Sequence, residues 1–193
     1  MYLIFDISAN GKPKSWKAPA SDVFNWPRLT HLAWLHYNED RELIAKSNDI
    51  IQPNNWKIKA EFEKKYQLTE ERAIEEGVPA KEALERFRDE IPKAKYVIAH
   101  NMNFSESVLT AEFTRHAMSH KLGTADKYCL MQEATWFCKL PGRGGKYKWP
   151  QLQELHAIVF GQRYANAGDA YTDVSAATLC FFRLVDLEAL ELF

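Results

Sequence analysis

Short runs of apolar residues mark the expected strands in the first half of the chain. Residues 2–7, YLIFDI, form a run that ends in an acid, and the turn residues after it predict a long loop. The segments 28–38 and 42–53 flank the polar turn EDR and predict a β-hairpin. A further strand is expected at residues 95–101, KYVIAHN.

Helical periodicity replaces this pattern later in the chain. It runs over residues 59–91, where the sequence EEGVP interrupts it, and returns at 103–120. A short helix is expected at 151–161 and a long one from about Asp169 to Leu190. Early strands followed by alternating strands and helices predict an α/β fold, with a mixed sheet covered by helices.

Composition limits the class of protein. The chain has 193 residues, 46% of them hydrophobic, which is enough for one substantial core, so we expect a single domain over 1–193. Twenty-five basic and 26 acidic residues give a net charge of -1, so any nucleic-acid binding must come from local patches. Three cysteines without a C-x-x-C pair, no leader pattern and no long apolar window favour a cytoplasmic protein without a membrane segment.

Two positions carry acids where a site is plausible. Asp6 is expected to close the first strand, and the carboxyl edge of an open α/β sheet is where such folds bind ligands. The alternative is an acid that caps a loop. Asp169 and Asp173 are one helical turn apart and share a face, which is either part of a site or a solvated surface.

Three polar residues near the end of the strand at 95–101 are candidates for a site. His100 and Asn101 stand at the strand end, where a histidine is more often structural than catalytic. Ser105 lies in the first turn of the next helix, where its hydroxyl could bond a backbone N–H. None of these residues indicates a function by itself.

Three ordered motifs give the chain a family resemblance. They are FDISANG at 5–11, AHNMNFS at 99–105 and GDAYTDV at 168–174, with KWPQLQELHAIVFG at 148–161 before the third. In this order they resemble the DEDDh 3'-5' exonucleases, the group that contains the epsilon proofreading subunit of bacterial DNA polymerase III and ribonuclease T. The resemblance spans nearly the whole chain. It implies a ribonuclease-H-like mixed sheet of five strands, three antiparallel and then two parallel, flanked by helices.

The resemblance also implies a catalytic site of four carboxylates and a histidine. Asp6 and Asp173 occupy two of the carboxylate positions. Ser8 and Ser105 occupy the other two, and Gly168 stands at the histidine position. Three of the five catalytic positions are therefore replaced.

The family reaction uses two Mg²⁺ or Mn²⁺ ions and a histidine base. Two divalent ions about 4 Å apart repel by roughly 16 kcal/mol at an effective dielectric of about 20, and four anionic ligands offset this repulsion. Asp6 and Asp173 would hold at most one ion weakly, and a missing base costs about 10²- to 10⁴-fold in rate. We therefore expect an inactive or severely impaired nuclease, a pseudo-enzyme with a degraded metal site.

Basic and aromatic residues remain that could bind a strand. The segment 12–17, KPKSWK, and the loop 139–150, KLPGRGGKYKWP, interleave lysine and arginine with tryptophan and tyrosine. Ordinary solvated loops would look the same. The nucleic-acid-binding residues expected from these patterns and from the resemblance are Asn101, Phe104, Arg143, Lys146 and Lys148.

The expected partner is a single-stranded nucleic-acid 3' end. The stretch 178–193, TLCFFRLVDLEALELF, has more apolar residues than one helical stripe needs, which suggests a protein partner or self-association. Two alternative functions stay open. One is a protein-interaction scaffold without nucleic-acid binding, and the other is a weak one-metal exonuclease that uses Asp6, Asp169 and Asp173.

Overall fold

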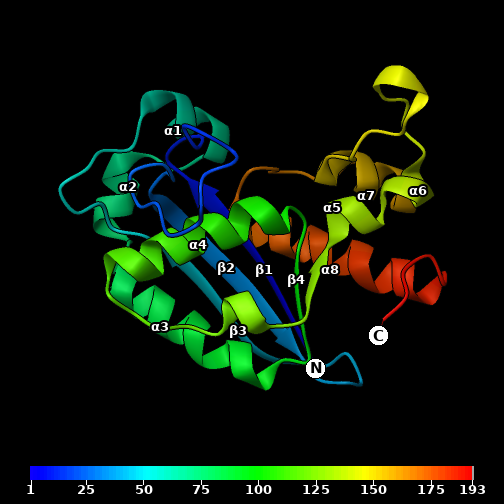
Figure 1. Cartoon of the computed structure of the whole chain (residues 1–193), viewed down its shortest axis with the longest axis horizontal. Coiled ribbons are helices and arrows are strands. Elements are labelled where there is room, and N and C mark those ends of the chain that lie inside the picture. Colours follow the sequence, from blue (N-terminus) through cyan, green and yellow to red (C-terminus); the bar gives the residue numbers. More distant parts are fainter. Residues whose placement is uncertain (193) are drawn as a thin grey trace.

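A mixed sheet of five strands forms the centre of the protein, which a computed structural model describes over residues 1–192 (Figure 1). The strand order is β3-β2-β1-β4-β5. Strands β1, β2 and β3 are antiparallel neighbours, and β4 and β5 run parallel to β1. This confirms the predicted α/β class and the ribonuclease-H-like sheet. The strands are β1 Tyr2–Ala9, β2 Leu29–Tyr37, β3 Leu43–Ile50, β4 Tyr96–Ala99 and β5 Lys127–Cys129.

Helices cover both faces of this sheet (Figure 1). Helices α3 and α4 pack on one face and α7 and α8 on the other, because residues from the two pairs belong to two separate apolar clusters. The α-helices are α1 Ala60–Tyr66, α2 Glu70–Glu75, α3 Ala80–Glu90, α4 Met102–Arg115, α5 Leu130–Glu133, α6 Thr135–Cys138, α7 Leu152–Phe160 and α8 Ala170–Asp186, with single 3-10 turns at Ile91–Lys93, Leu122–Thr124 and Arg143–Gly145.

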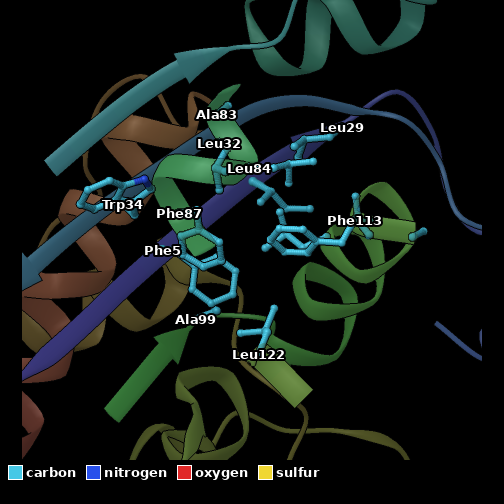
Figure 2. Close-up of a cluster of buried hydrophobic side chains, with 14 of the residues drawn as sticks. Phe5, Leu29, Leu32, Trp34, Ala83, Leu84, Phe87, Ala99, Phe113 and Leu122 are labelled. Atoms are coloured by element: carbon cyan, nitrogen blue, oxygen red, sulfur yellow. The ribbon is translucent and has the colours of Figure 1, made fainter. Parts of the chain in front are cut away.

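Strand β1 is buried on both faces, which explains its nearly continuous apolar run. Alternate side chains point to opposite faces of a strand, so Leu3 and Phe5 enter one cluster and Ile4 enters the other. Phe5 packs against Phe87 of α3 with ring centroids 5.0 Å apart, and Figure 2 shows the side chains around this pair. Burial on this scale is the main source of the stability of the fold.

Two sequence predictions about the elements were wrong. Asp6 does not close β1, since the strand continues to Ala9 by pairing with β2 alone. The helix expected at 103–120 ends at Arg115, and Ala117 takes a left-handed φ of 52°. Strand β5 and the short helices α5 and α6 were not placed from the sequence, although five strands were expected from the resemblance.

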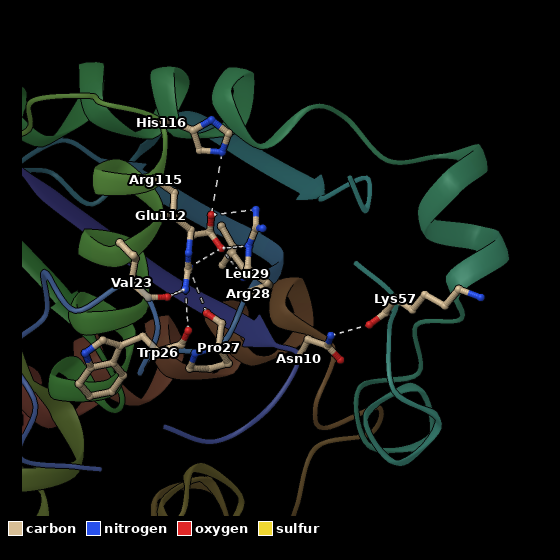
Figure 3. Close-up of polar contacts among 10 residues, drawn as sticks. All are labelled: Asn10, Val23, Trp26, Pro27, Arg28, Leu29, Lys57, Glu112, Arg115 and His116. Atoms are coloured by element: carbon tan, nitrogen blue, oxygen red, sulfur yellow. Dashed lines mark hydrogen bonds and ion pairs between the residues drawn. The ribbon is translucent and has the colours of Figure 1, made fainter. Parts of the chain in front are cut away.

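A buried ion-pair network ties the loop after β1 to α4 (Figure 3). Glu112 of α4 is buried and accepts hydrogen bonds from Arg28 Nε at 2.8 Å, Arg115 Nη1 at 2.8 Å and the backbone N–H of Leu29 at 3.0 Å. Arg115 also donates to the carbonyls of Val23 and Trp26. The loop between β1 and β2 is therefore held in place beside α4.

Helix α8 buries much of the apolar surface that suggested a partner. Its residues pack on β1, β2 and α7, and Phe182 packs edge-on against Tyr2 and Tyr37. Leu179 and Leu187 remain exposed, so self-association through this helix stays a prediction. Phe193, the last residue of the predicted stretch, lies outside the described residues. None of the helices within 1–192 combines the length and hydropathy needed to cross a lipid bilayer.

Candidate nucleic-acid 3'-end site

A cavity opens where the parallel pairing of β1 and β4 ends. That pairing stops at Ile4 and Ile98, so the edge of β1 beyond Ile4 has no strand beside it on that side. Asp6, two residues further along β1, lines the cavity that opens there. The cavity has a volume of about 470 Å³, and we call it the sheet-edge pocket. The residues that line it include Asp6, Lys12, Trp16, Lys65, Tyr66, His100, Asn101, Phe104, Ser105, Tyr164, Gly168 and Asp173.

The two retained acids share this pocket. Burial raises the pKa of Asp6 well above its usual value, and the neighbouring charge of Asp173 raises it further. Burial also raises the pKa of Asp173, although hydrogen bonds from Tyr164 and Gly168 to its carboxylate oppose that rise. The pair therefore lies in a site that disfavours two adjacent negative charges.

The carboxylate of Asp173 is already hydrogen-bonded within the chain. The Tyr164 hydroxyl donates to Oδ1 at 2.7 Å, and the N–H of Gly168 donates to Oδ2 at 3.0 Å. Burial and then the hydrogen bond to Asp173 raise the pKa of Tyr164, so this tyrosine stays protonated and remains a donor. Ser8 Oγ donates to the carbonyl of Gly168 at 3.2 Å, so Gly168 is hydrogen-bonded to both Ser8 and Asp173.

Gly168, where the sequence resemblance places the catalytic histidine of the family, has a conformation that leaves little room for a side chain. Its φ is +102°, which L side chains rarely adopt, and a Cβ built there would lie 2.5 Å from the carbonyl oxygen of Lys65. Lys65 belongs to α1, which thus approaches the backbone of residue 168 closely. An imidazole at this position would require movement of the 65–66 segment or of residue 168.

Asp169 does not join the acid pair. It is the N-cap of α8, where Oδ2 accepts from the N–H and the hydroxyl of Thr172, both at 2.9 Å. Its other oxygen lies 3.9 Å from His31 Nδ1. Within residues 1–192, no group of three or more His, Cys, Asp or Glu side chains has the geometry to hold a metal ion.

The residues present do not fit a pair of divalent cations. Two ions need several anionic oxygens with free lone pairs, whereas this pocket offers Asp6 and a carboxylate on Asp173 that already accepts hydrogen bonds. Ser8 and Ser105 supply neutral hydroxyls, and that of Ser8 is directed at a carbonyl. The mismatch therefore follows from the donor set itself.

His100 has a structural environment. Its Nε2–H donates to the carbonyl of Pro150 at 3.1 Å, which links the end of β4 to the segment before α7. Burial lowers the pKa of His100 to about 4, so the ring is neutral at physiological pH. Ser105 is also buried, and it borders the pocket from the first turn of α4.

Aromatic and amide groups form the other side of the pocket. Asn101 is the N-cap of α4 but makes no side-chain cap hydrogen bond, and Phe104 follows in the first turn. Phe104 lies 5.8 Å from the ring of Trp16, which the loop after β1 brings to the rim with 57% of its surface exposed. Lys12 and Lys65 add positive charge at the same opening. These groups can stack on a base and neutralise phosphate.

The basic loop lies apart from this lining. Arg143, Lys146 and Lys148 are on a projecting segment and do not line the sheet-edge pocket. Lys148 Nζ pairs with Glu154 at 2.5 Å. Lys65 and Tyr164 line the pocket but were not predicted from the sequence, since no local pattern distinguishes either residue.

Comparison with known proteins finds similarity in structure alone. No protein-family model matches the chain, and no curated protein does. Exonuclease I of E. coli in complex with a dT13 oligonucleotide superposes with a TM-score of 0.73 at 17% identity, over 97% of this chain and 42% of that one. A zinc-bound form of that exonuclease with single-stranded DNA gives 0.73 at 17% identity, over 96% and 40%.

A second exonuclease is matched over nearly its whole length. The nuclease domain of 3'hExo, a DEDDh family member bound to rAMP, gives a TM-score of 0.72 at 11% identity, over 97% of this chain and 92% of that domain. The chain thus spans less than half of exonuclease I but almost all of this nuclease domain. At such low identities the likeness concerns the fold, and the chain has the fold of these exonucleases.

Proposed function

We propose that this chain is a nucleic-acid-associated member of the DEDDh 3'-5' exonuclease group that binds a single-stranded 3' end and hydrolyses it little or not at all. Residues 1–193 would act as one exonuclease-like domain, similar to the epsilon proofreading subunit. The observation that carries the proposal is the sheet-edge pocket. It keeps an aromatic, amide and lysine lining while its retained acid Asp173 is hydrogen-bonded within the chain.

The binding half of the proposal rests on the pocket lining. Phe104 and Trp16 offer aromatic faces to a terminal base, and Lys12 and Lys65 lie where its phosphates would enter. Asn101 has an amide that is not used as a helix cap. Exonuclease I, of which this chain matches 42%, is in complex with a dT13 oligonucleotide, and the 3'hExo nuclease domain is bound to rAMP, which supports a nucleic-acid ligand here.

The catalytic half rests on charge and on the missing base. The metal pair of the family would meet one carboxyl with a raised pKa and one engaged carboxylate, so its mutual repulsion of roughly 16 kcal/mol is not offset. Gly168 has no side chain to remove a proton from water. The histidine that lines the pocket, His100, is a poor base because burial lowers its pKa to about 4, and its Nε2–H donates a hydrogen bond to a carbonyl. Binding is therefore expected without efficient hydrolysis.

Fluorescence anisotropy with a labelled single-stranded dodecamer tests the binding half. We expect an affinity that falls as salt rises, because phosphate contacts release counterions. Phe104→Ala should weaken binding by about 5- to 150-fold, from the loss of about 1–3 kcal/mol of stacking. Phe24→Ala is the matched control, since Phe24 is exposed and does not line the pocket.

Two results would contradict the proposal. Absence of binding at low salt would leave the protein-interaction scaffold as the better description. Equal losses in Phe104→Ala and Phe24→Ala would show that the strand does not enter the sheet-edge pocket.

A further inference from the structure

The loop before α7 is an ordered hairpin. Pro141 and Tyr147 form an antiparallel bridge, the N–H of Gly142 donates to the carbonyl of Lys146 at 2.9 Å, and that of Lys148 donates to Leu140 at 3.0 Å. A Cβ on Gly142 would lie 2.7 Å from the Lys146 carbonyl oxygen, so this close approach needs glycine. We call residues 139–149, together with Trp136 of α6, the aromatic hairpin.

Three large aromatic side chains of the aromatic hairpin are open to solvent. Trp136 is 74% exposed, Trp149 59% and Tyr147 40%. The rings of Trp136 and Tyr147 meet edge to face with centroids 5.3 Å apart, so they stand as a fixed pair. Exposed apolar groups gathered on one projecting segment indicate a binding surface.

The same hairpin carries uncompensated positive charge. Lys139, Arg143 and Lys146 form no ion pair with any residue in the described part of the chain, whereas Lys148 is paired with Glu154. Cations between exposed aromatic rings match the alternation of phosphates and bases along a single strand. Tryptophan, tyrosine and arginine also anchor protein interfaces, but positive charges placed along the hairpin among the rings favour a ligand that carries both phosphates and bases.

The aromatic hairpin is continuous with the sheet-edge pocket. Trp149 is followed by Pro150, whose carbonyl accepts the hydrogen bond from His100, and by Gln151, which lines the pocket. The base of the hairpin is therefore fixed at the rim of the pocket while its tip projects outward (Figure 1).

We propose that the aromatic hairpin binds the nucleotides on the 5' side of the 3' end. Their bases would stack on Trp136 and Trp149, and their phosphates would lie beside Lys139, Arg143 and Lys146. The inference rests on the proposed function, because it takes the 3' end to occupy the sheet-edge pocket. It adds a second contact surface, which makes affinity depend on strand length.

A length series with matched variants tests this inference. We expect the wild-type protein to bind a dodecamer more tightly than a trinucleotide. Trp136→Ala should weaken dodecamer binding by about 5- to 150-fold and leave trinucleotide binding unchanged. Lys146→Ala should reduce the salt slope for the dodecamer by about 0.7, and Lys81→Ala, on the exposed side of α3, should not change it.

The outcomes separate this inference from the proposed function. Failure of the wild-type protein to bind any oligonucleotide would reject both. Trinucleotide binding that Phe104→Ala weakens, with no loss of dodecamer affinity in Trp136→Ala, would reject the hairpin contact alone. A wild-type dimer that Trp136→Ala converts to monomer, with unchanged oligonucleotide affinity, would assign the hairpin to self-association instead. Melting curves serve as the folding control, since Trp136 is mostly exposed.

Discussion

Replacing Gly168, where the resemblance implies a histidine, gives a direct test of how closely α1 approaches this residue. Gly168→Ala should destabilise the fold, and Gly168→His should do so at least as strongly. The reason is local and steric: φ is +102°, and the added Cβ would lie 2.5 Å from the carbonyl oxygen of Lys65. The fold would therefore be destabilised by a histidine at position 168.

The expected loss in the free energy of unfolding has two contributions. A non-glycine residue held in such a conformation costs about 1–3 kcal/mol, and forcing an atom into an occupied space costs about 1–3 kcal/mol more. Gly168→Ala is thus expected to lower the free energy of unfolding by about 2–6 kcal/mol. Gly145 is the matched control, since its φ is +73° but no heavy atom lies within 4 Å of its added Cβ. Gly145→Ala should cost only about 1–2 kcal/mol.

Thermal and urea unfolding of the two alanine variants measure the difference. For a chain of this length each kcal/mol lowers Tm by about 2–4 °C. Equal destabilisation of Gly168→Ala and Gly145→Ala would refute the reasoning, because it would show that α1 does not close on residue 168. Tolerance of Gly168→His would refute it more strongly, since the catalytic position would then be open to an imidazole.

Three further predictions concern charges and hydrogen bonds. Folding raises the pKa of Asp6, so the ionisation of this carboxyl lowers the stability of the fold as pH rises from about 4 through the folded pKa. Asp6→Asn should therefore have a higher Tm than the wild type at pH 8 but not at about pH 4 and below. A pH-independent difference in Tm would contradict this. Glu112→Gln leaves two partly buried arginines without their carboxylate and should cost about 3–5 kcal/mol, against about 0–1 for Glu76→Gln in an exposed pair. Similar losses in urea unfolding would argue against the buried network. Tyr164→Phe removes a charge-assisted hydrogen bond to Asp173, so it should lower the free energy of unfolding by about 1–3 kcal/mol and raise the pKa of the Asp173 carboxyl further. An unchanged titration of Asp173 by NMR would show that the bond is not formed.

Strong periodic patterns made most of the sheet predictable from sequence. The hairpin of β2 and β3 was expected because apolar runs flank a short polar turn, and β4 because it is a fully buried apolar segment. Strand β5 was not placed because it has three residues, too few to show a period. Asp6 interrupts the apolar run of β1, but pairing with β2 carries the strand on to Ala9, which is a tertiary effect that local pattern does not contain.

The site was predictable by motif order but not by its contacts. The motifs located Asp6, Ser105 and Gly168, and the structure brings all three to one pocket. No local pattern predicts that Tyr164 bonds Asp173, because a residue in an irregular loop has no periodic signal. The basic loop was predicted from the sequence, but its position relative to the pocket was not. In the folded chain this loop lies beside the pocket and does not line it.

We propose that this chain holds a 3' end without cutting it. A dodecamer labelled at its 5' end, incubated with excess protein and Mg²⁺ or Mn²⁺, reports anisotropy and strand length in the same sample. Sustained high anisotropy with a full-length strand is the result we predict. Progressive loss of nucleotides from the 3' end, abolished by Asp6→Ala, would contradict the account.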